Sequence, residues 1–255
     1  MNSSNNDPFF VGYLSTPKKL LPFLFTAAFV AIAGFAAMAL LIGAKQDDPG
    51  DASFRFAWGA QTLTGVLEAA PYPIVHVTAG TKHIPTGRTI MLSGNGKRGV
   101  ASRAQPLDGQ LVQVTGIALK RGDLDMLQLR GGTKGLKKAE NGVGQSVPVK
   151  QLGGWRLTGE ICDGKCLAGA MRPGRGLSHK ACANLCLNGG LPPVFVSTAP
   201  VDGRSFFLMG SLDGKALTPD VFDHVALYIT LEGLVERRGQ LHIFKIDPKS
   251  LKLAD

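Results

Sequence analysis

An uncharged, apolar run near the N-terminus constrains this chain more than any other feature. From Leu20 to Ala44, no charged side chain interrupts 25 consecutive residues. As an α-helix this run would be about 37 Å long at roughly 1.5 Å per residue, and the hydrocarbon core of a bilayer is about 30 Å thick. The apolar part of a cleaved signal peptide is usually only about 7–15 residues. We therefore expect residues 20–44 to be an uncleaved transmembrane helix in contact with the lipid bilayer.

The charges that flank this run predict its orientation. Lys18 and Lys19 precede it, and Asp47 and Asp48 follow it. Because positively charged flanks favour the cytoplasmic side, we expect a cytoplasmic tail at 1–19, a juxtamembrane segment at 45–60 and export of the remainder. The sequence holds no second run of this kind. The prediction is a single-pass protein of the bacterial inner membrane with periplasmic domains.

The chain has more basic than acidic residues, and such an excess can serve to bind an acidic partner. The formal net charge is +9, while aromatic residues make up only 7% of the chain. Nucleic-acid-binding surfaces need clustered cations and often aromatic side chains on which bases stack. Here the basic residues are scattered and the region that carries them is expected outside the cytoplasm. We expect no nucleic-acid partner.

The exported region contains an internal repeat. Residues 61–68 (QTLTGVLE) resemble 155–162 (WRLTGEIC), 88–94 resemble 204–210, and 115–129 resemble 232–246. Each block is β-rich and bounded by glycine, which is typical of strand–turn–strand units. The fold class expected is therefore mainly β: two tandem small barrels of the oligonucleotide/oligosaccharide-binding (OB) type, with a small sandwich as the alternative. The domains expected are a first barrel at 61–130, a Gly/Lys linker at 131–150 and a second barrel at 151–255.

The second copy carries an insertion that the first copy lacks. The blocks that begin at 61 and 155 lie 94 residues apart, whereas those that begin at 88 and 204 lie 116 residues apart. The additional residues are the cysteine segment, 162–188, which we expect to be a helical loop after the first strand of the second barrel. That loop often takes part in binding in OB folds. The other interpretation is that the long insertion has no binding role and needs cross-links, such as disulfides, to stay ordered.

All the cysteines of the chain lie in this insertion, as two C-x3-C pairs: Cys162, Cys166, Cys182 and Cys186. An even number in an oxidising compartment favours two disulfides, without a cofactor, although four cysteines allow three pairings. A metal site is the second interpretation, either from all four thiolates or from Cys166, His179, Cys182 and Cys186, and it would hold zinc or an iron–sulfur cluster. A reactive thiol pair is the third, because the segment also contains basic residues that lower thiol pKa values.

The cysteine segment also resembles a family of exported or membrane-anchored bacterial proteins. The shared pattern is G-x-(I/V)-x-D-x-x-C, then H-x-x-C-A-x-x-C-(I/L/V)-x-G-G, carried on a small β-barrel. The matching positions cover roughly 155–250 and are Gly159, Asp163, Cys166, His179, Cys182, Ala183, Cys186, Gly189 and Gly190. Cys162 departs from the pattern, which usually has an apolar residue there. The resemblance implies a small barrel and an exported location, no particular activity, and a zinc-type site of three sulfurs and one nitrogen.

The sequence favours a binding role over catalysis. It contains no G-x-S-x-G, Walker loop or H-E-x-x-H motif, and the Gly-rich stretch 94–99 (GNGKRG) lacks P-loop spacing, so we expect a hairpin there. The function expected is an accessory or assembly subunit that docks on a membrane protein complex of redox type. The alternative is a metal-binding or thiol-redox module that uses the Cys/His loop.

Overall fold

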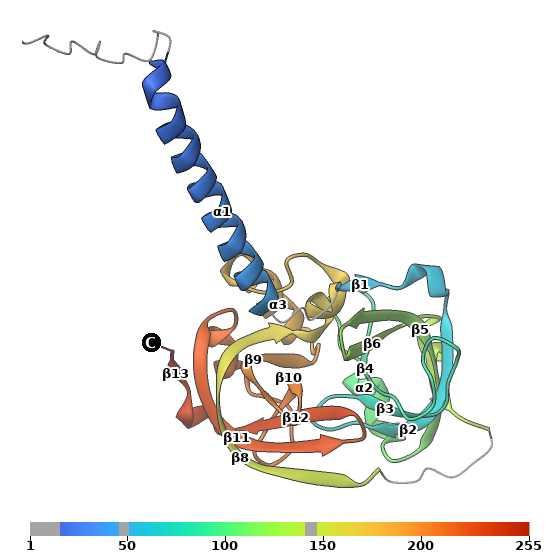
Figure 1. Ribbon diagram of the computed structural model, residues 1–255. Coiled ribbons are helices and arrows are strands. Elements are labelled where there is room, and N and C mark those ends of the chain that lie inside the picture. The colour runs from blue at the N-terminus through green and yellow to red at the C-terminus, as the bar shows by residue number, and fades with distance from the viewer. Residues whose placement is uncertain (1–15, 46–50, 141–146, 255) are drawn as a thin grey trace, which may run out of the picture. The chain divides into compact units, whose positions relative to one another are not determined.

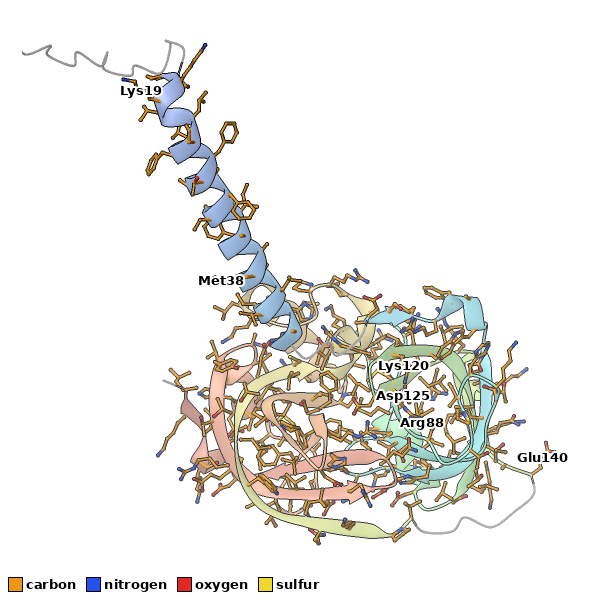
Figure 2. All side chains as sticks on the ribbon, viewed as in Figure 1. Lys19, Met38, Arg88, Lys120, Asp125 and Glu140 are labelled. Carbon is orange, nitrogen blue, oxygen red and sulfur yellow. The ribbon has the colours of Figure 1, made fainter. Side chains whose placement is uncertain are left out.

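The computed structural model describes residues 16–45, 51–140 and 147–254. It divides into two compact units, Met1–Asp48 and Pro49–Asp255. In the first unit, η1 (Lys18–Leu20) leads into α1 (Leu21–Lys45). This helix is long and apolar enough to cross a membrane, and Figure 2 shows side chains projecting from all around it. The expected helix is confirmed, whereas residues 1–15 of the expected tail lie outside the described residues.

The first sheet of the second unit closes into a five-stranded barrel. Around the barrel the strands pair in the order β5–β2–β3–β4–β6–β5, and only β4 and β6 run parallel. Two short strands, β1 and β7, add to β5. The bounds are β1 (Ser53–Phe54), β2 (Gln61–Glu68), β3 (Ile74–Ala79), β4 (Thr89–Ser93), β5 (Leu111–Arg121), β6 (Leu124–Leu129) and β7 (Leu136–Lys138).

The second sheet repeats this pairing order. β8 pairs with β9 and β11, β9 with β10, β10 with β12 in parallel, and β12 with β11. β13 adds to β11, and the two sheets are seen in Figure 1. The bounds are β8 (Val149–Asp163), β9 (Pro193–Val201), β10 (Arg204–Ser211), β11 (Tyr228–Arg238), β12 (Leu241–Ile246) and β13 (Lys252–Leu253).

Short helices occupy the connections. Before and within the first sheet these are η2 (Phe56–Trp58), α2 (Ala101–Ala104), η3 (Gln105–Leu107) and η4 (Gly132–Gly135). The second sheet has η5 (Cys166–Ala170), η6 (Leu177–His179), α3 (Lys180–Asn188), η7 (Pro219–His224) and η8 (Pro248–Ser250). Because η4 and β7 fall within 131–150, the expected linker is in part regular structure, and its residues 141–146 lie outside the described ones. The expected juxtamembrane segment likewise contains β1 and η2.

Equivalent glycines support the repeat seen in the sequence. A Cβ on Gly116 would lie 2.3 Å from the carbonyl oxygen of Gln128, and one on Gly233 would lie 2.2 Å from that of Lys245. Each of these two glycines thus permits the same close approach of two paired strands. The hairpin glycines also match, because Gly122 and Gly239 have φ values of 54° and 61°, a left-handed conformation that favours glycine.

Buried apolar side chains form one core inside each sheet and a third between them. Leu67 and Val114 belong to the core of the first sheet, and Phe195 and Phe244 to that of the second. The third core joins Ile74 and Met91 of the first sheet to residues of the second such as Leu208, and it includes residues of the cysteine segment. The two sheets therefore pack on each other through an apolar interface, which fixes the surroundings of the cysteine segment.

We predict that Gly233→Ala destabilises the second unit by about 2 kcal/mol, in the range observed for overpacking, because the new methyl group meets backbone that cannot move aside. Gly154→Ala is the matched control on the adjacent strand β8, since a Cβ there has no atom within 4 Å. Thermal unfolding of the full chain measures both. Equal melting temperatures for the two variants would contradict this account of the repeat.

Candidate functional site

The cysteine segment connects the first two strands of the second sheet. It runs from the end of β8 at Asp163 to the start of β9 at Pro193, whereas the equivalent connection in the first sheet spans only 69–73. The long connection thus follows the first strand of the second sheet, although Cys162 and Asp163, at the start of the expected insertion 162–188, belong to β8. α3 carries Cys182 and Cys186 one turn apart and ends at Asn188, before Gly189, as the sequence indicates.

Asp163 organises this segment from its buried end. Its side chain is 0% exposed, because it closes β8 beneath the loop. Oδ1 accepts a hydrogen bond of 2.8 Å from the backbone N–H of Cys166, and Oδ2 lies 3.0 Å from Nε2 of His179. One carboxylate therefore sets the start of η5 and the position of the histidine ring. The sequence analysis did not place Asp163 among the site residues. The D-x-x-C spacing from Asp163 to Cys166 could have indicated this role.

The donor atoms of the segment gather around Cys166. One group consists of Cys166, His179 and Cys182, whose ligand atoms all lie within 4.8 Å of one another. A second group, with the same limit, consists of Asp163, Cys166 and Cys186. The structure thus brings together all four residues of the predicted metal alternative, with Cys166 common to both groups.

Cys162 does not join this cluster. It is the penultimate residue of β8 rather than part of the loop, and successive side chains of a strand point to opposite faces. Its thiol is buried in the core between the two sheets and lies 3.4 Å from a carboxylate oxygen of Glu160. The first C-x3-C pair is therefore split between a strand and a helical turn.

The predicted disulfides are absent from the structure, in which Cys162, Cys166, Cys182 and Cys186 are all free thiols. The physical reason is the position of Cys162. A second bond would need its sulfur, and that sulfur lies in the interface core. The other three cysteines pack together with Leu191.

Two lysines connect this cluster to the first sheet, and sequence reasoning missed both contacts. Nζ of Lys97, from the Gly-rich stretch 94–99, lies 2.7 Å from Sγ of Cys182 and 3.4 Å from Sγ of Cys186. Nζ of Lys165 donates to the carbonyl oxygens of Gly94 and Gly96 at 2.8 and 2.7 Å. Stretch 94–99 is thus one wall of the site. The hairpin expected there is wrong, because the stretch turns from β4 into α2 rather than into a second strand.

Glycine is required where stretch 94–99 meets the end of α3. The N–H of Gly99 donates to the carbonyl of Gly189 at 2.7 Å. A Cβ on Gly189 would lie 1.8 Å from the carbonyl oxygen of Lys97, and one on Gly99 would lie 1.9 Å from that of Gly190. This close backbone contact holds Lys97 against the cysteines.

A hydrogen bond joins the sulfur atoms of Cys166 and Cys186 and shifts their pKa values in opposite directions. The hydrogen bond from Cys166, followed by the neighbouring Lys97 ammonium, lowers the pKa of Cys186 to about 7 in spite of its burial. The same hydrogen bond, together with burial, raises the pKa of Cys166. The pKa of Lys97 is raised, first by its bond to Cys182. Near neutral pH, Cys186 is therefore partly a thiolate and Cys166 is the thiol that donates to it.

A cleft of about 440 Å³ opens beside this cluster, between the cysteine segment and the first sheet. Phe54 and Phe56 lie on one side with their rings stacked at 4.9 Å. Lys97, Arg130 and Lys165 supply positive charge, and Cys166 and Cys186 also line the cleft. Its volume falls in the range of about 300–1,000 Å³ that ligand pockets occupy.

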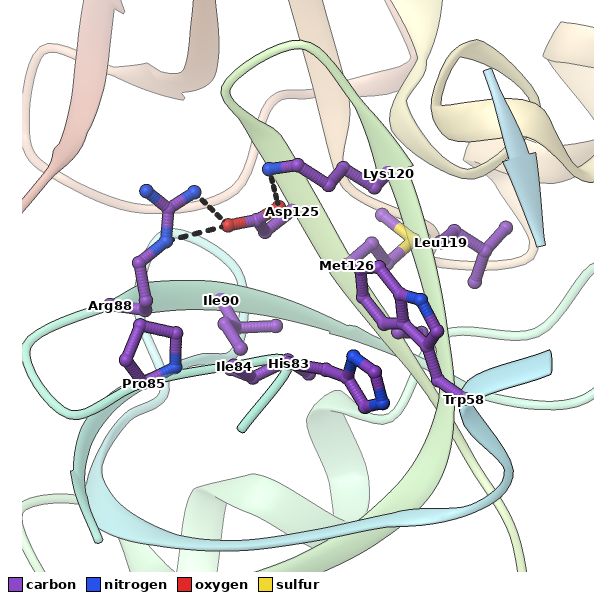
Figure 3. Close-up of a pocket in the computed structure, with 11 residues that line it drawn as sticks. Trp58, His83, Ile84, Pro85, Arg88, Ile90, Leu119, Lys120, Asp125 and Met126 are labelled. Atoms are coloured by element: carbon purple, nitrogen blue, oxygen red, sulfur yellow. Dashed lines mark hydrogen bonds and ion pairs between the residues drawn. The ribbon is translucent and has the colours of Figure 1, made fainter. Parts of the chain in front are cut away.

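A smaller cavity in the first barrel, of about 180 Å³, offers less to a ligand (Figure 3). Trp58 and His83 stack at 4.8 Å on one side of it. Asp125 accepts hydrogen bonds from Nε of Arg88 and from Nζ of Lys120, each at 2.8 Å. Because both cations are already paired with Asp125 and the cavity is smaller than the cleft, we place the candidate site at the cysteine segment.

Comparison of the chain with models of protein families, with curated proteins and with solved structures finds no match in any of the three. The resemblance of the cysteine segment to an exported bacterial family therefore stays a prediction, and the assignment of function depends on the geometry of the site.

We predict that Cys186 reacts with iodoacetamide at a rate that rises with pH and is half-maximal at about pH 7, because the thiolate is the nucleophile. Cys162 is the internal control, since burial raises the pKa of its thiol and keeps it unreactive. Mass spectrometry of the reduced full chain measures both residues. Lys97→Gln should move the Cys186 midpoint upward, and a wild-type midpoint near the ordinary thiol value of about 8.5 would contradict the account.

Proposed function

We propose that this protein is a membrane-anchored metal-binding accessory module that holds one soft metal ion at Cys166, His179, Cys182 and Cys186. The observation that carries the proposal is the convergence of these donor atoms around Cys166. Two sulfurs on one zinc ion lie roughly 3.8 Å apart, from Zn–S bonds of about 2.3 Å at tetrahedral angles. Within each group of three donors the limit of 4.8 Å is within reach of small side-chain movements. Because Cys186 belongs to a different group from His179 and Cys182, its sulfur must also move toward them for one ion to bind all four residues.

The contact between Asp163 and His179 supports this proposal independently. Histidines that bind a metal commonly use one ring nitrogen and donate the other N–H to a carboxylate, which fixes the tautomer. The Oδ2–Nε2 distance of 3.0 Å in the buried Asp163–His179 pair fits that role. Asp163 would then hold the ring in place for the ion.

The position of Cys162 favours a single ion over an iron–sulfur cluster. Such clusters commonly need four thiolates, and the thiol of Cys162 is buried between the sheets. Three thiolates and one imidazole suit zinc or monovalent copper. Sδ of Met171, only 3.4 Å from Sγ of Cys182, adds a soft thioether near the same position.

We also propose that both sheets are OB-type barrels produced by duplication, with the exported unit in the bacterial periplasm. The shared pairing order and the equivalent glycines support duplication. Lys18 and Lys19 before the apolar helix support a cytoplasmic N-terminus. Within this arrangement the module serves a membrane protein complex of redox type, and it needs no catalytic residue of its own.

A thiol-redox role for Cys166 and Cys186 is the second candidate. The hydrogen bond between their sulfurs and the lowered pKa of Cys186 favour it, because such a pair reacts readily with disulfides. Binding of a metal ion would require both sulfurs as thiolates and would block that chemistry. Titration with metal therefore separates the two candidates.

We predict that the reduced full chain in lipid nanodiscs binds one equivalent of Zn²⁺ in competition with a chromogenic chelator. Cys166→Ser and Cys182→Ser should abolish stoichiometric binding because each removes a thiolate. Asp163→Asn should weaken binding by about 10–100-fold, as loss of a group that orients a ligand does. Cys162→Ser is the matched control and should bind as the wild type does.

Two outcomes of this titration would contradict the proposal. The first is a folded wild-type chain that binds no Zn²⁺ and no Cu⁺. The second is a loss of affinity in Cys162→Ser as large as that in Cys166→Ser. Rapid, reversible formation of a Cys166–Cys186 disulfide in a chain that binds neither ion would support the redox candidate instead.

The predicted topology has its own test. A reporter enzyme that is active only after forming disulfides, fused after Asp255, should be active in bacterial cells, because disulfides form in the periplasm and not in the cytoplasm. The same reporter fused before Met1 should be inactive. The reverse pattern would show that the exported unit lies in the cytoplasm.

A further inference from the structure

The cleft beside the cysteine cluster contains a buried lysine that forms no ion pair with a carboxylate among the residues that the structure describes. Lys165 is 3% exposed, and its ammonium group donates hydrogen bonds to the carbonyls of Gly94 and Gly96. A buried ammonium is costly unless it is paired, so an anion placed beside Lys165 would be stabilised.

A second cation lies on the same cleft. Arg130 is exposed at its edge, whereas Lys97 is already engaged with the cysteine sulfurs. No described Asp or Glu lines the cleft, and the Cys186 thiol in its lining already contacts Lys97. Two cations are thus available to a negatively charged group that enters from solvent.

The apolar side of the cleft indicates what the rest of the ligand is. Phe56 is 62% exposed, although its ring stacks on that of Phe54. An exposed aromatic ring on the wall of a cleft, supported by a second ring, offers a flat apolar surface on which planar groups pack by offset stacking. Met171 adds a flexible thioether to the same lining, which adapts readily to aromatic rings.

We propose that this cleft binds an organic anion with a planar, aromatic body, whose charged group lies between Lys165 and Arg130 and whose ring packs on Phe56. This site is additional to the proposed metal centre and does not need the ion, although Cys166 and Cys186 also line the cleft. Its cations and aromatic rings come from β1, η2, stretch 94–99, the end of β6 and the start of the cysteine segment, and His179 lies outside the cleft lining.

Phenyl phosphate is the probe, because it combines an aromatic ring with a phosphate group and is water-soluble. Calorimetric titration of the full chain in lipid nanodiscs, with empty nanodiscs as the blank, should show one saturable site. Inorganic phosphate lacks the ring and phenol lacks the phosphate group. Each should bind at least about tenfold more weakly than phenyl phosphate, a factor that corresponds to about 1.4 kcal/mol. Equal binding of inorganic phosphate would overturn the assignment of an aromatic ligand.

Three variants decide where the probe binds. Lys165→Met should abolish binding, and Arg130→Gln, at an exposed position that tolerates substitution, should weaken it by about tenfold, as loss of a charge-assisted hydrogen bond does. Arg98→Gln is the matched control, because Arg98 is an exposed cation of stretch 94–99 outside the cleft lining. No binding by the wild type, or binding that Arg130→Gln leaves unchanged, would overturn the proposal.

His179→Ala separates this proposal from the metal centre. The variant should lose Zn²⁺ affinity and keep its affinity for phenyl phosphate, because the imidazole does not line the cleft. Loss of phenyl phosphate binding in a folded His179→Ala chain would refute an independent anion site. Failure of Zn²⁺ binding alone would leave the anion site standing.

Discussion

The buried carboxylate of Asp163 is the contact on which the candidate site depends. It sits at the end of β8, where the extended strand gives way to the inserted loop, and it bonds both the backbone of Cys166 and the ring of His179. A carboxylate with no exposure to water must be paired to persist. Its two partners are therefore held together, and the sulfurs of Cys182 and Cys186 on α3 each lie within 4.8 Å of the Cys166 sulfur.

Packing between the two sheets makes this arrangement rigid. The third apolar core contains Cys162, Leu167 and Ala168 of the cysteine segment together with side chains of both sheets. Stretch 94–99 of the first sheet then meets α3 through the Gly99–Gly189 hydrogen bond. The site is consequently built from both copies of the repeat, and the first copy contributes a wall although it has no cysteine. This explains why a long insertion can stay ordered without disulfides in the structure.

The sequence predicted features that depend on local pattern. The uncharged run specified α1, the repeat specified equivalent hairpins, and the shift in offset located the insertion between two strands. It could not show that the two C-x3-C pairs differ in structure. Their spacing is the same, yet the first pair begins at Cys162 on a strand and the second lies on a helix. It also could not find Lys97 and Lys165, since their contacts join residues 85 and 71 positions apart along the chain. Such contacts follow from packing of the sheets, which no local motif encodes.

The most direct test of the metal centre is X-ray absorption spectroscopy of the zinc-loaded full chain. The account predicts a first coordination sphere of three sulfur atoms at about 2.3 Å and one nitrogen at about 2.0–2.1 Å. Replacement of that nitrogen by another light ligand in His179→Ala would confirm the histidine. A sphere of four sulfurs would show that Cys162 leaves the interface core to bind the ion, and a sphere without sulfur would show that the cysteine cluster is not the metal site; either result would contradict the account.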